Sequence, residues 1–140
     1  MKVMVERGGY MPQRAHFDDA GIDFRTPEEF TLQPHGGSRV VDLKVRVQIP
    51  VGCFGKLESK SGLNVNHNIQ CTGGVIDSGF RGSIKVRITN NGDQAYTFKQ
   101  GDKIVQMVLI PVLLADLQQV PMLDDSISGR DEAGWGSTGR

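Results

Sequence analysis

Short segments in which apolar and polar residues alternate constrain the fold of this chain more than any other feature. Every second residue from Val41 to Ile49 is apolar, and Ile84, Val86 and Ile88 alternate with polar residues between Ser83 and Thr89. Successive side chains of a β-strand point to opposite faces, so both segments are predicted to be half-buried strands. Eighteen glycines and six prolines are spread along the chain, and no long amphipathic helical pattern is present. The sequence therefore predicts an all-β sandwich or barrel.

Several further segments are predicted to be strands, and one is predicted to be a short helix. The strands are an edge strand over Lys2 to Glu6, the segments Phe30 to Leu32, Cys53 to Glu58 and Tyr96 to Phe98, a doubly buried central strand over Lys103 to Val112, and a last strand over Leu117 to Leu123. The helix is expected to make one or two turns over Leu63 to Asn66. Ser78 and Gly79 suit a tight turn, which predicts that Val75 and Ile76 fold back on the following strand as a hairpin.

Length, charge and cysteine content narrow the class of protein. The chain has 140 residues, which fits one domain with one core. Its 16 basic and 16 acidic residues give no net charge, so neither a nucleic-acid partner nor a membrane partner is expected. The sequence shows no signal peptide and no run of about 18 apolar residues. Cys53 and Cys71 lack the spacing of a zinc site, and we expect both to be buried thiols of a cytoplasmic protein.

Asp77 is the first candidate for chemistry, because it follows a short apolar run at the predicted turn. Phe80 lies three residues further on and Gly82 comes just after it, so the turn brings a carboxylate, an aromatic ring and accessible backbone into one small space. The alternative is that Asp77 only forms the turn.

A second group of candidates suits an anionic ligand. The run Ser59-Lys60-Ser61-Gly62 offers hydroxyls, a cation and accessible amides for phosphate, although a solvated loop before the helix is the alternative. Alternation in the run Ile22-Asp23-Phe24 predicts that the Asp23 side chain points away from the core. It is either a solvated strand residue or an acid that orients a cation or a water. Gln106 interrupts a buried apolar strand, so its amide needs a backbone or ligand partner.

The polar, glycine-rich tail after Leu123 would by its composition be disordered. It contains Arg130, the only tryptophan (Trp135), and the hydroxyl pair Ser137 and Thr138. An arm with these groups can close over a nucleotide, placing the ring on the base and the donors on the phosphates.

Five stretches together resemble, in order and spacing, the five motifs of the trimeric dUTPases. They are AGIDFR (20–25), SKSGL (59–63), GVIDSGFRG (74–82), GDKIVQMV (101–108) and RDEAGWGSTG (130–139). The resemblance covers essentially the whole chain. It implies a distorted jelly-roll β-barrel that forms a homotrimer with active sites shared between subunits. It also implies that residues 1–128 form the jelly-roll domain and that residues 129–140 form a flexible arm that closes over the active site.

The resemblance implies a reaction as well. Such enzymes convert dUTP and water to dUMP and pyrophosphate, with Mg²⁺ held mainly by the triphosphate. Asp77 matches the aspartate that orients and deprotonates the water attacking the α-phosphorus. A carboxylate suits this role, because it is ionised at neutral pH and can accept the proton. Asp23 matches an acid that contacts the metal ion through water.

Substrate contacts are also carried over from the resemblance. The backbone at Gly73 and Gly74 would read the uracil edge, and Phe80 takes the place of a tyrosine that packs on deoxyribose. The phosphate contacts fall to Lys60, Ser61, Gly62 and Gln106. In the arm, Trp135 would stack on uracil, Ser137 and Thr138 would bind the γ-phosphate, and Arg130 would help to close the site.

Some positions depart from the family pattern. Ser59 and Lys60 stand where proline and arginine are usual, Gly79 where an acid is common, and Phe80 where tyrosine is found; in the tail, Asp131 and Ala133 replace glycines and Trp135 replaces phenylalanine. Two other functions are considered. One is a dCTP deaminase-like enzyme, which needs a glutamate signature that is not found around Asp77. The other is a nucleotide-dependent regulatory binding protein of the phage type.

Overall fold

The computed structural model describes residues 1–124 and residue 127, and this part of the chain is mostly β with one short helix. The strands are β1 Lys2–Val5, β2 Gly21–Arg25, β3 Phe30–Leu32, β4 Gly37–Asp42, β5 Val45–Gln48, β6 Cys53–Glu58, β7 Ile69–Thr72, β8 Val75–Ile76, β9 Lys85–Asn90, β10 Tyr96–Phe98 and β11 Lys103–Pro111, and the helix is α1 Ser61–His67. The β class predicted from the alternating segments is confirmed, and so is a short helix after the polar loop.

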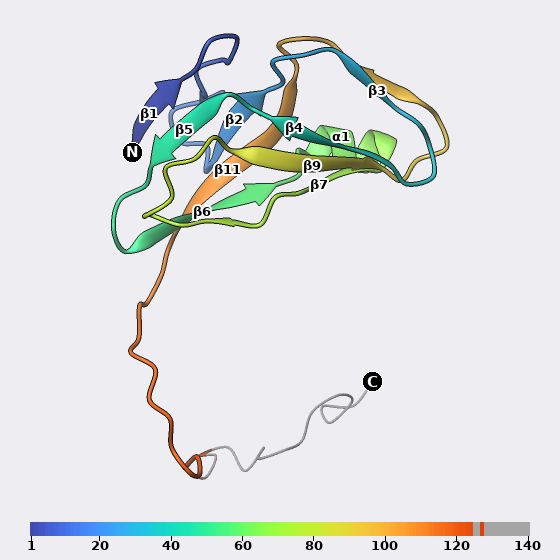
Figure 1. Ribbon diagram of the computed structural model, residues 1–140. Coiled ribbons are helices and arrows are strands. Elements are labelled where there is room, and N and C mark those ends of the chain that lie inside the picture. The colour runs from blue at the N-terminus through green and yellow to red at the C-terminus, as the bar shows by residue number, and fades with distance from the viewer. Residues whose placement is uncertain (125–126, 128–140) are drawn as a thin grey trace.

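Two larger sheets form the body of the molecule (Figure 1). One has the strand order β2-β11-β6-β8 and the other the order β4-β9-β7, with every pair antiparallel. Two-stranded sheets, β1-β5 and β3-β10, complete the strand pairing of the described residues. β11 lies between β2 and β6, as its apolar sequence predicted, and α1 packs beside β7.

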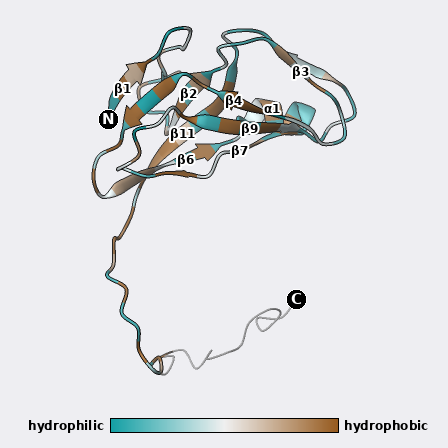
Figure 2. Ribbon diagram, in the orientation of Figure 1, coloured by the Kyte–Doolittle hydropathy of each residue, from teal (hydrophilic) through white to brown (hydrophobic). Residues whose placement is uncertain are grey.

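The alternating segments supply the core. Val41, Leu43, Val45, Val47 and Ile49 are at most 3% exposed, and Ile84, Val86 and Ile88 are at most 1% exposed. Figure 2 shows the alternation as bands of opposite hydropathy along β5 and β9. These side chains join one hydrophobic cluster with residues of β2, β6 and β11, so a single core holds the sheets together.

The prediction of one continuous strand from Val41 to Ile49 is wrong. Lys44 has φ of 57°, which lies in the left-handed region, and its backbone N–H donates to Asp42 Oδ1 at 3.0 Å. This turn ends β4, which pairs with β9, and it precedes β5, which pairs with β1. The alternation therefore predicted which residues are buried but not the break in the backbone.

The predicted hairpin is also wrong. β8 pairs with β6, whereas β9 pairs with β4 and β7, so the two segments belong to different sheets. The turn between them is present, since the backbone N–H of Phe80 donates to the carbonyl of Asp77 at 3.1 Å. Residues 77–82, called the Asp77 loop below, therefore form part of a connection between two sheets.

Leu117 to Leu123 form no strand in the described part of the chain, contrary to the prediction. After β11 the chain leaves the body, as Figure 1 shows in orange. Leu113 and Leu117 are 91% and 99% exposed, because the body of the same chain does not cover this segment. A strand needs a hydrogen-bonding partner, and none lies beside these residues within the part of the chain that is described.

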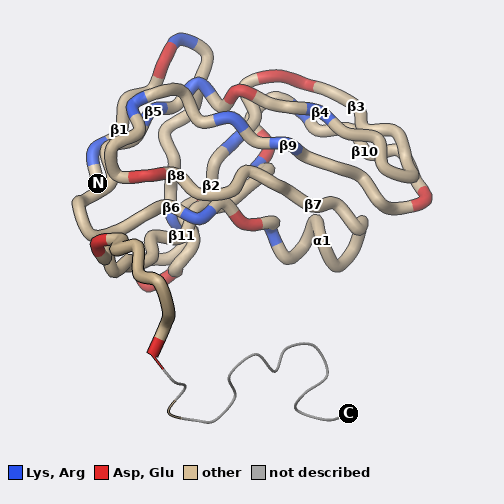
Figure 3. Tube along the Cα trace, turned by 60° about the horizontal axis from the view of Figure 1, so that its bottom comes forward, with Lys and Arg blue, Asp and Glu red and all other residues tan. Residues whose placement is uncertain are grey.

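Charged side chains of both signs are interspersed along the described chain (Figure 3). No helix among the described residues has the length and apolar character needed to cross a membrane. Cys53 and Cys71 are free thiols, as predicted, but they are partly rather than fully buried.

Candidate active site

Asp77 and Phe80 line one cavity of about 620 Å³ at the surface of the chain. Asp77 is exposed, and Phe80 is 40% exposed although its ring is apolar. The other walls come from the end of β1, from β4, β5 and β8, and from the segment leading into β9. The cavity thus combines an accessible carboxylate with an uncovered aromatic ring, as the sequence predicted for this loop.

The two glycines before β8 have different backbone requirements. Gly74 has φ of 70°, a conformation that strongly favours glycine, and its carbonyl accepts a hydrogen bond from Leu57 N at 3.2 Å. A Cβ atom on Gly73 would lie 2.5 Å from Leu57 Cδ1. The backbone therefore lies close against β6 at the point where the uracil edge is expected to bind.

Several side chains that the sequence analysis missed hold the Asp77 loop. Arg81 Nη1 donates to the carbonyls of Ser78 and Phe80 at 2.7 and 2.8 Å, which closes the loop on itself. Arg46 Nη1 donates to the carbonyl of Arg81 at 3.3 Å, and Arg46 also forms an ion pair with Glu6. The loop is therefore tied to β5 and, through Glu6, to the end of β1.

A second support comes from Asp42. Ser83 Oγ donates to Asp42 Oδ1 at 2.5 Å, and Lys44 Nζ lies 3.3 Å from Asp42 Oδ2. Burial alone raises the pKa of Asp42, but the hydrogen bonds from Ser83 and Lys44 outweigh it, so the pKa lies below the usual value. No local signal pairs Asp42 with Ser83, because 41 positions separate them in the sequence.

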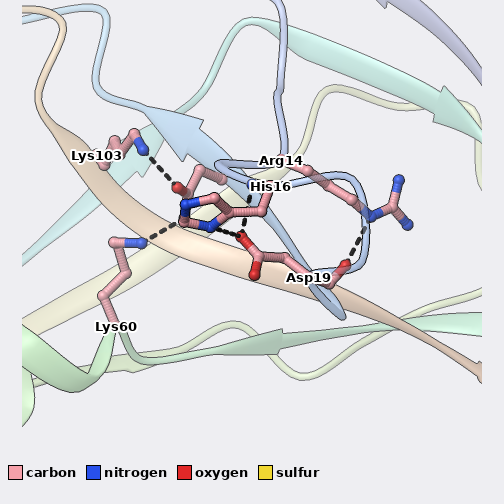
Figure 4. Close-up of polar contacts among 6 residues, drawn as sticks. Arg14, His16, Asp19, Lys60 and Lys103 are labelled. Carbon is pink, nitrogen blue, oxygen red and sulfur yellow. Dashed lines mark hydrogen bonds and ion pairs between the residues drawn. The ribbon is translucent and has the colours of Figure 1, made fainter.

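Two of the residues expected to bind phosphate lie beside Asp23: Lys60 pairs with it, and Gln106 is its partner in the β2–β11 register. Its side chain is 8% exposed and forms ion pairs with Lys60 and, at 2.8 Å, with Lys103. Figure 4 shows the two lysine side chains approaching from different elements, with the His16 and Asp19 pair nearby. The expectation of a solvated Asp23 is wrong, because both lysines cover the carboxylate.

The charge state of Asp23 follows from these contacts. Burial raises its pKa, but the hydrogen bonds from Lys103 and Lys60 and the positive charges of both residues lower it by more. The net pKa lies below the usual value, so the carboxylate is ionised at neutral pH. Lys103 is a further residue that the sequence analysis missed, although it lies in the same motif as Gln106.

Gln106 has a backbone partner in this structure. Its Nε2 donates to the carbonyl of Ser59 at 3.0 Å, while the hydroxyl of Ser59 accepts a hydrogen bond from Cys71 N at 2.9 Å. The start of the polar loop is therefore held by β11 on one side and by β7 on the other. Ser61 and Gly62 follow as the exposed first turn of α1, where Asn64 N donates to the carbonyl of Lys60 at 2.9 Å.

One chain holds its carboxylate cavity and its phosphate candidates at separate places. In the β6–β8 register Gly55 faces Ile76, so Asp77 lies level with Phe54, five positions from Ser59. Five residues of strand span about 16 Å. Accordingly, Lys60, Ser61, Gly62 and Gln106 are not among the residues lining the cavity of Asp77. The predicted arm residues Arg130, Trp135, Ser137 and Thr138 lie outside the described residues.

Comparison with known proteins identifies the family. A family model described as dUTPase matches residues 8–139. The chain belongs to the dUTPase family. The deoxyuridine 5'-triphosphate nucleotidohydrolase of Debaryomyces hansenii is 36% identical over 130 residues, covering 93% of this chain and 81% of that protein. The corresponding protein of an Anaeromyxobacter species is 42% identical over 123 residues, covering 86% of this chain and 82% of that protein. The predicted family and the predicted enzyme class, a nucleotide hydrolase, are thereby confirmed.

Solved structures agree with this assignment. The dUTPase of Staphylococcus bacteriophage 80alpha with dUPNHPP has a TM-score of 0.87 and 29% identity, covering 99% of this chain and 98% of that chain. A mutant dUTPase from phage phi11 of S. aureus, with a TM-score of 0.78 and 28% identity over 86% of this chain and 96% of that chain, coordinates a structural Mg(II) ion.

The acidic residues near the predicted phosphate site bear on how Mg²⁺ could be bound. They contain no group of three or more His, Cys, Asp or Glu side chains that could hold a metal ion. Mg²⁺ usually keeps several waters and binds one or two carboxylates together with substrate phosphates. The ionised Asp23, beside the predicted phosphate loop, fits a contact with a metal-bound water. The carboxylate of Asp23 therefore fits an ion that a triphosphate carries.

Proposed function

We propose that the chain hydrolyses dUTP to dUMP and pyrophosphate, with Asp77 activating the attacking water. The observation that carries this proposal is the shared cavity of Asp77 and Phe80 in a chain of the dUTPase family. Phe80 offers its ring to the deoxyribose, and the backbone at Gly73 and Gly74 offers polar groups to uracil. This division of roles follows the sequence resemblance. The exposure of the Asp77 and Phe80 side chains supports it.

The reaction is a displacement at the α-phosphorus. The oxygen of the water forms a bond to phosphorus while its proton passes to the carboxylate of Asp77, and the bond to the oxygen bridging the α- and β-phosphates breaks. Lys60, Ser61, Gly62 and Gln106 bind the phosphates, and Asp23 would hold a water of the Mg²⁺ ion that the triphosphate carries. Mg²⁺ bound to the triphosphate supplies positive charge that stabilises the phosphate oxygens.

The active form is proposed to be a homotrimer of distorted jelly-roll subunits. Support comes from the separation of Asp77 from the phosphate candidates, and from the apolar segment 112–123, in which Leu113 and Leu117 are almost fully exposed. Closed threefold symmetry would cover such a segment and bring groups from different chains into one site. Residues 1–128 are proposed as the domain of each subunit, and residues 129–140 as the arm that closes the site. Free thiols at Cys53 and Cys71 are compatible with a cytoplasmic location.

The test compares products and one matched pair of variants. The purified chain with Mg²⁺ should release pyrophosphate from dUTP and no ammonia from dCTP. Asp77→Asn should lower turnover by about 10²–10⁴-fold, the usual contribution of a general base, while binding a non-hydrolysable dUTP analogue. Asp93→Asn is the control, because Asp93 is an exposed residue in the bend before β10 and does not line the cavity of Asp77. Wild-type turnover by Asp77→Asn would remove the catalytic role, and ammonia release from dCTP would identify a deaminase instead.

A further inference from the structure

Two ammonium groups share one buried carboxylate at the predicted phosphate site. Lys60 and Lys103 both pair with Asp23, whose side chain is 8% exposed. One cation is enough to balance one carboxylate, so the cluster carries an excess positive charge. The lysine side chains are 26% and 36% exposed, so both heads can still be reached from solvent.

The two lysines differ in their access to the phosphate loop. Lys60 directly precedes Ser61 and Gly62, so a small movement of its side chain takes its ammonium towards a bound phosphate. Lys103 begins β11, where its position is fixed opposite Arg25 of β2. If Lys60 leaves Asp23 for a phosphate, a buried carboxylate close to an anionic ligand needs another cation.

We propose that Lys103 is a positioning residue of the triphosphate site: it holds the Asp23 carboxylate and thereby frees Lys60 to bind a phosphate group. This inference rests on the proposed function of the site. Lys103 and Lys60 each lower the pKa of Asp23, so Lys103 can keep the carboxylate ionised while Lys60 binds a phosphate. The departure at position 60 also agrees, since a lysine ammonium exchanges partners as a point charge, whereas an arginine binds a carboxylate through a planar fork.

The test is calorimetric binding of inorganic tripolyphosphate with Mg²⁺ to the full chain. Lys103→Met should weaken binding by about tenfold or more, because Lys60 is then retained by Asp23. Lys103→Arg should bind within about threefold of wild type. Lys99→Met is the matched control, since Lys99 is 70% exposed and pairs with Glu29 at 3.4 Å on the surface.

A double-mutant cycle distinguishes positioning from direct contact. In a Lys60→Met background there is no ammonium to release, so adding Lys103→Met should weaken tripolyphosphate binding clearly less than it does in the wild type. The remaining loss reflects the Asp23 carboxylate left without a cation. An equal effect of Lys103→Met in both backgrounds would overturn the proposal, because Lys103 would then contact the phosphates itself. Wild-type affinity of the Lys103→Met variant would overturn it as well.

A further variant tests whether the loss of tripolyphosphate affinity in Lys103→Met is caused by misfolding. Asp23→Asn removes the charge that Lys103 holds, so Asp23→Asn with Lys103→Met should bind within about twofold of Asp23→Asn alone. A large additional loss in the double variant would contradict the proposal. Tripolyphosphate has no nucleoside, so these outcomes do not depend on which nucleotide is hydrolysed. Pyrophosphate release from dUTP tests the proposed function separately.

Discussion

Replacing Gly21 by alanine should destabilise the protein through one contact. A Cβ atom on Gly21 would lie 2.1 Å from Gln106 Oε1 and 3.1 Å from Gln106 Cδ. Carbon and oxygen atoms without a bond need more than about 3 Å, so the amide must move by about 1 Å. That movement breaks the hydrogen bond from Gln106 Nε2 to the Ser59 carbonyl, which is 3.0 Å long.

The expected size follows from two opposing contributions. Losing the hydrogen bond and leaving a partly buried carbonyl without its partner costs about 1–3 kcal/mol. Alanine offsets part of this cost by about 0.4–1 kcal/mol, because it restricts the unfolded chain more than glycine does. Gly21→Ala should therefore lower the free energy of unfolding by about 1–2 kcal/mol.

Urea unfolding followed by circular dichroism at one fixed protein concentration measures this change. Gln106→Ala removes the two atoms closest to the new methyl group and leaves Gln106 Cβ at an ordinary contact distance of 3.4 Å, so Gly21→Ala should be neutral or slightly stabilising in that background. Gly79→Ala serves as the control, because no atom lies within 4 Å of its Cβ position. If Gly21→Ala destabilised the Gln106→Ala protein as much as the wild type, the explanation through Gln106 would be wrong.

Two further predictions concern the thiols and the exposed apolar segment. Burial raises the pKa of Cys71 to about 11, so at pH 8 only about one molecule in a thousand carries the thiolate. Iodoacetamide should therefore label Cys71 far more slowly in the native than in the urea-unfolded protein. Rapid labelling of Cys71 in the native protein, located by mass spectrometry, would contradict this burial. Light scattering should give three times the mass of one chain. Replacing Leu113 and Leu117 by serine should shift the protein towards monomers that hydrolyse dUTP poorly. A monomer with wild-type activity would exclude an active site shared between subunits.

Alternation in the sequence predicted burial well, because it reports which face of a strand each side chain points to. Val41 to Ile49 and Ile84 to Ile88 alternate, and their apolar side chains all reach the core. It did not predict the break at Lys44, although Asp42 two residues earlier is a side chain that often caps such a turn. Strand pairing was harder to predict than burial. Val75 and Ile76 pair with β6 and not with the segment that follows them, and this pairing depends on contacts between residues distant in the sequence.

Some site residues were predicted from the sequence, whereas contacts between residues distant in the sequence were not. The family resemblance assigned Lys60 and Gln106 to the phosphates and Asp23 to the metal ion, and the structure brings the three together because β11 lies between β2 and β6 and the polar loop follows β6. The pairing of Lys103 with Asp23 could not be deduced, since 80 positions separate the two residues and no pattern in either segment refers to the other.

The distance between Asp77 and the phosphate loop bears on whether one chain can form the complete site. Asp77 follows β8 and lies level with the start of β6, whereas the phosphate loop follows the end of β6, and a paired strand in a close-packed core cannot shorten to bring them together. A small rotation of side chains does not cover about 16 Å of strand. On the proposed function, which places the Asp77 carboxylate and the cations at one triphosphate, a second copy of the chain supplies one of the two. On this reasoning the Leu113 and Leu117 variant should lose activity when its subunits separate, even though neither residue lies in the cavity of Asp77.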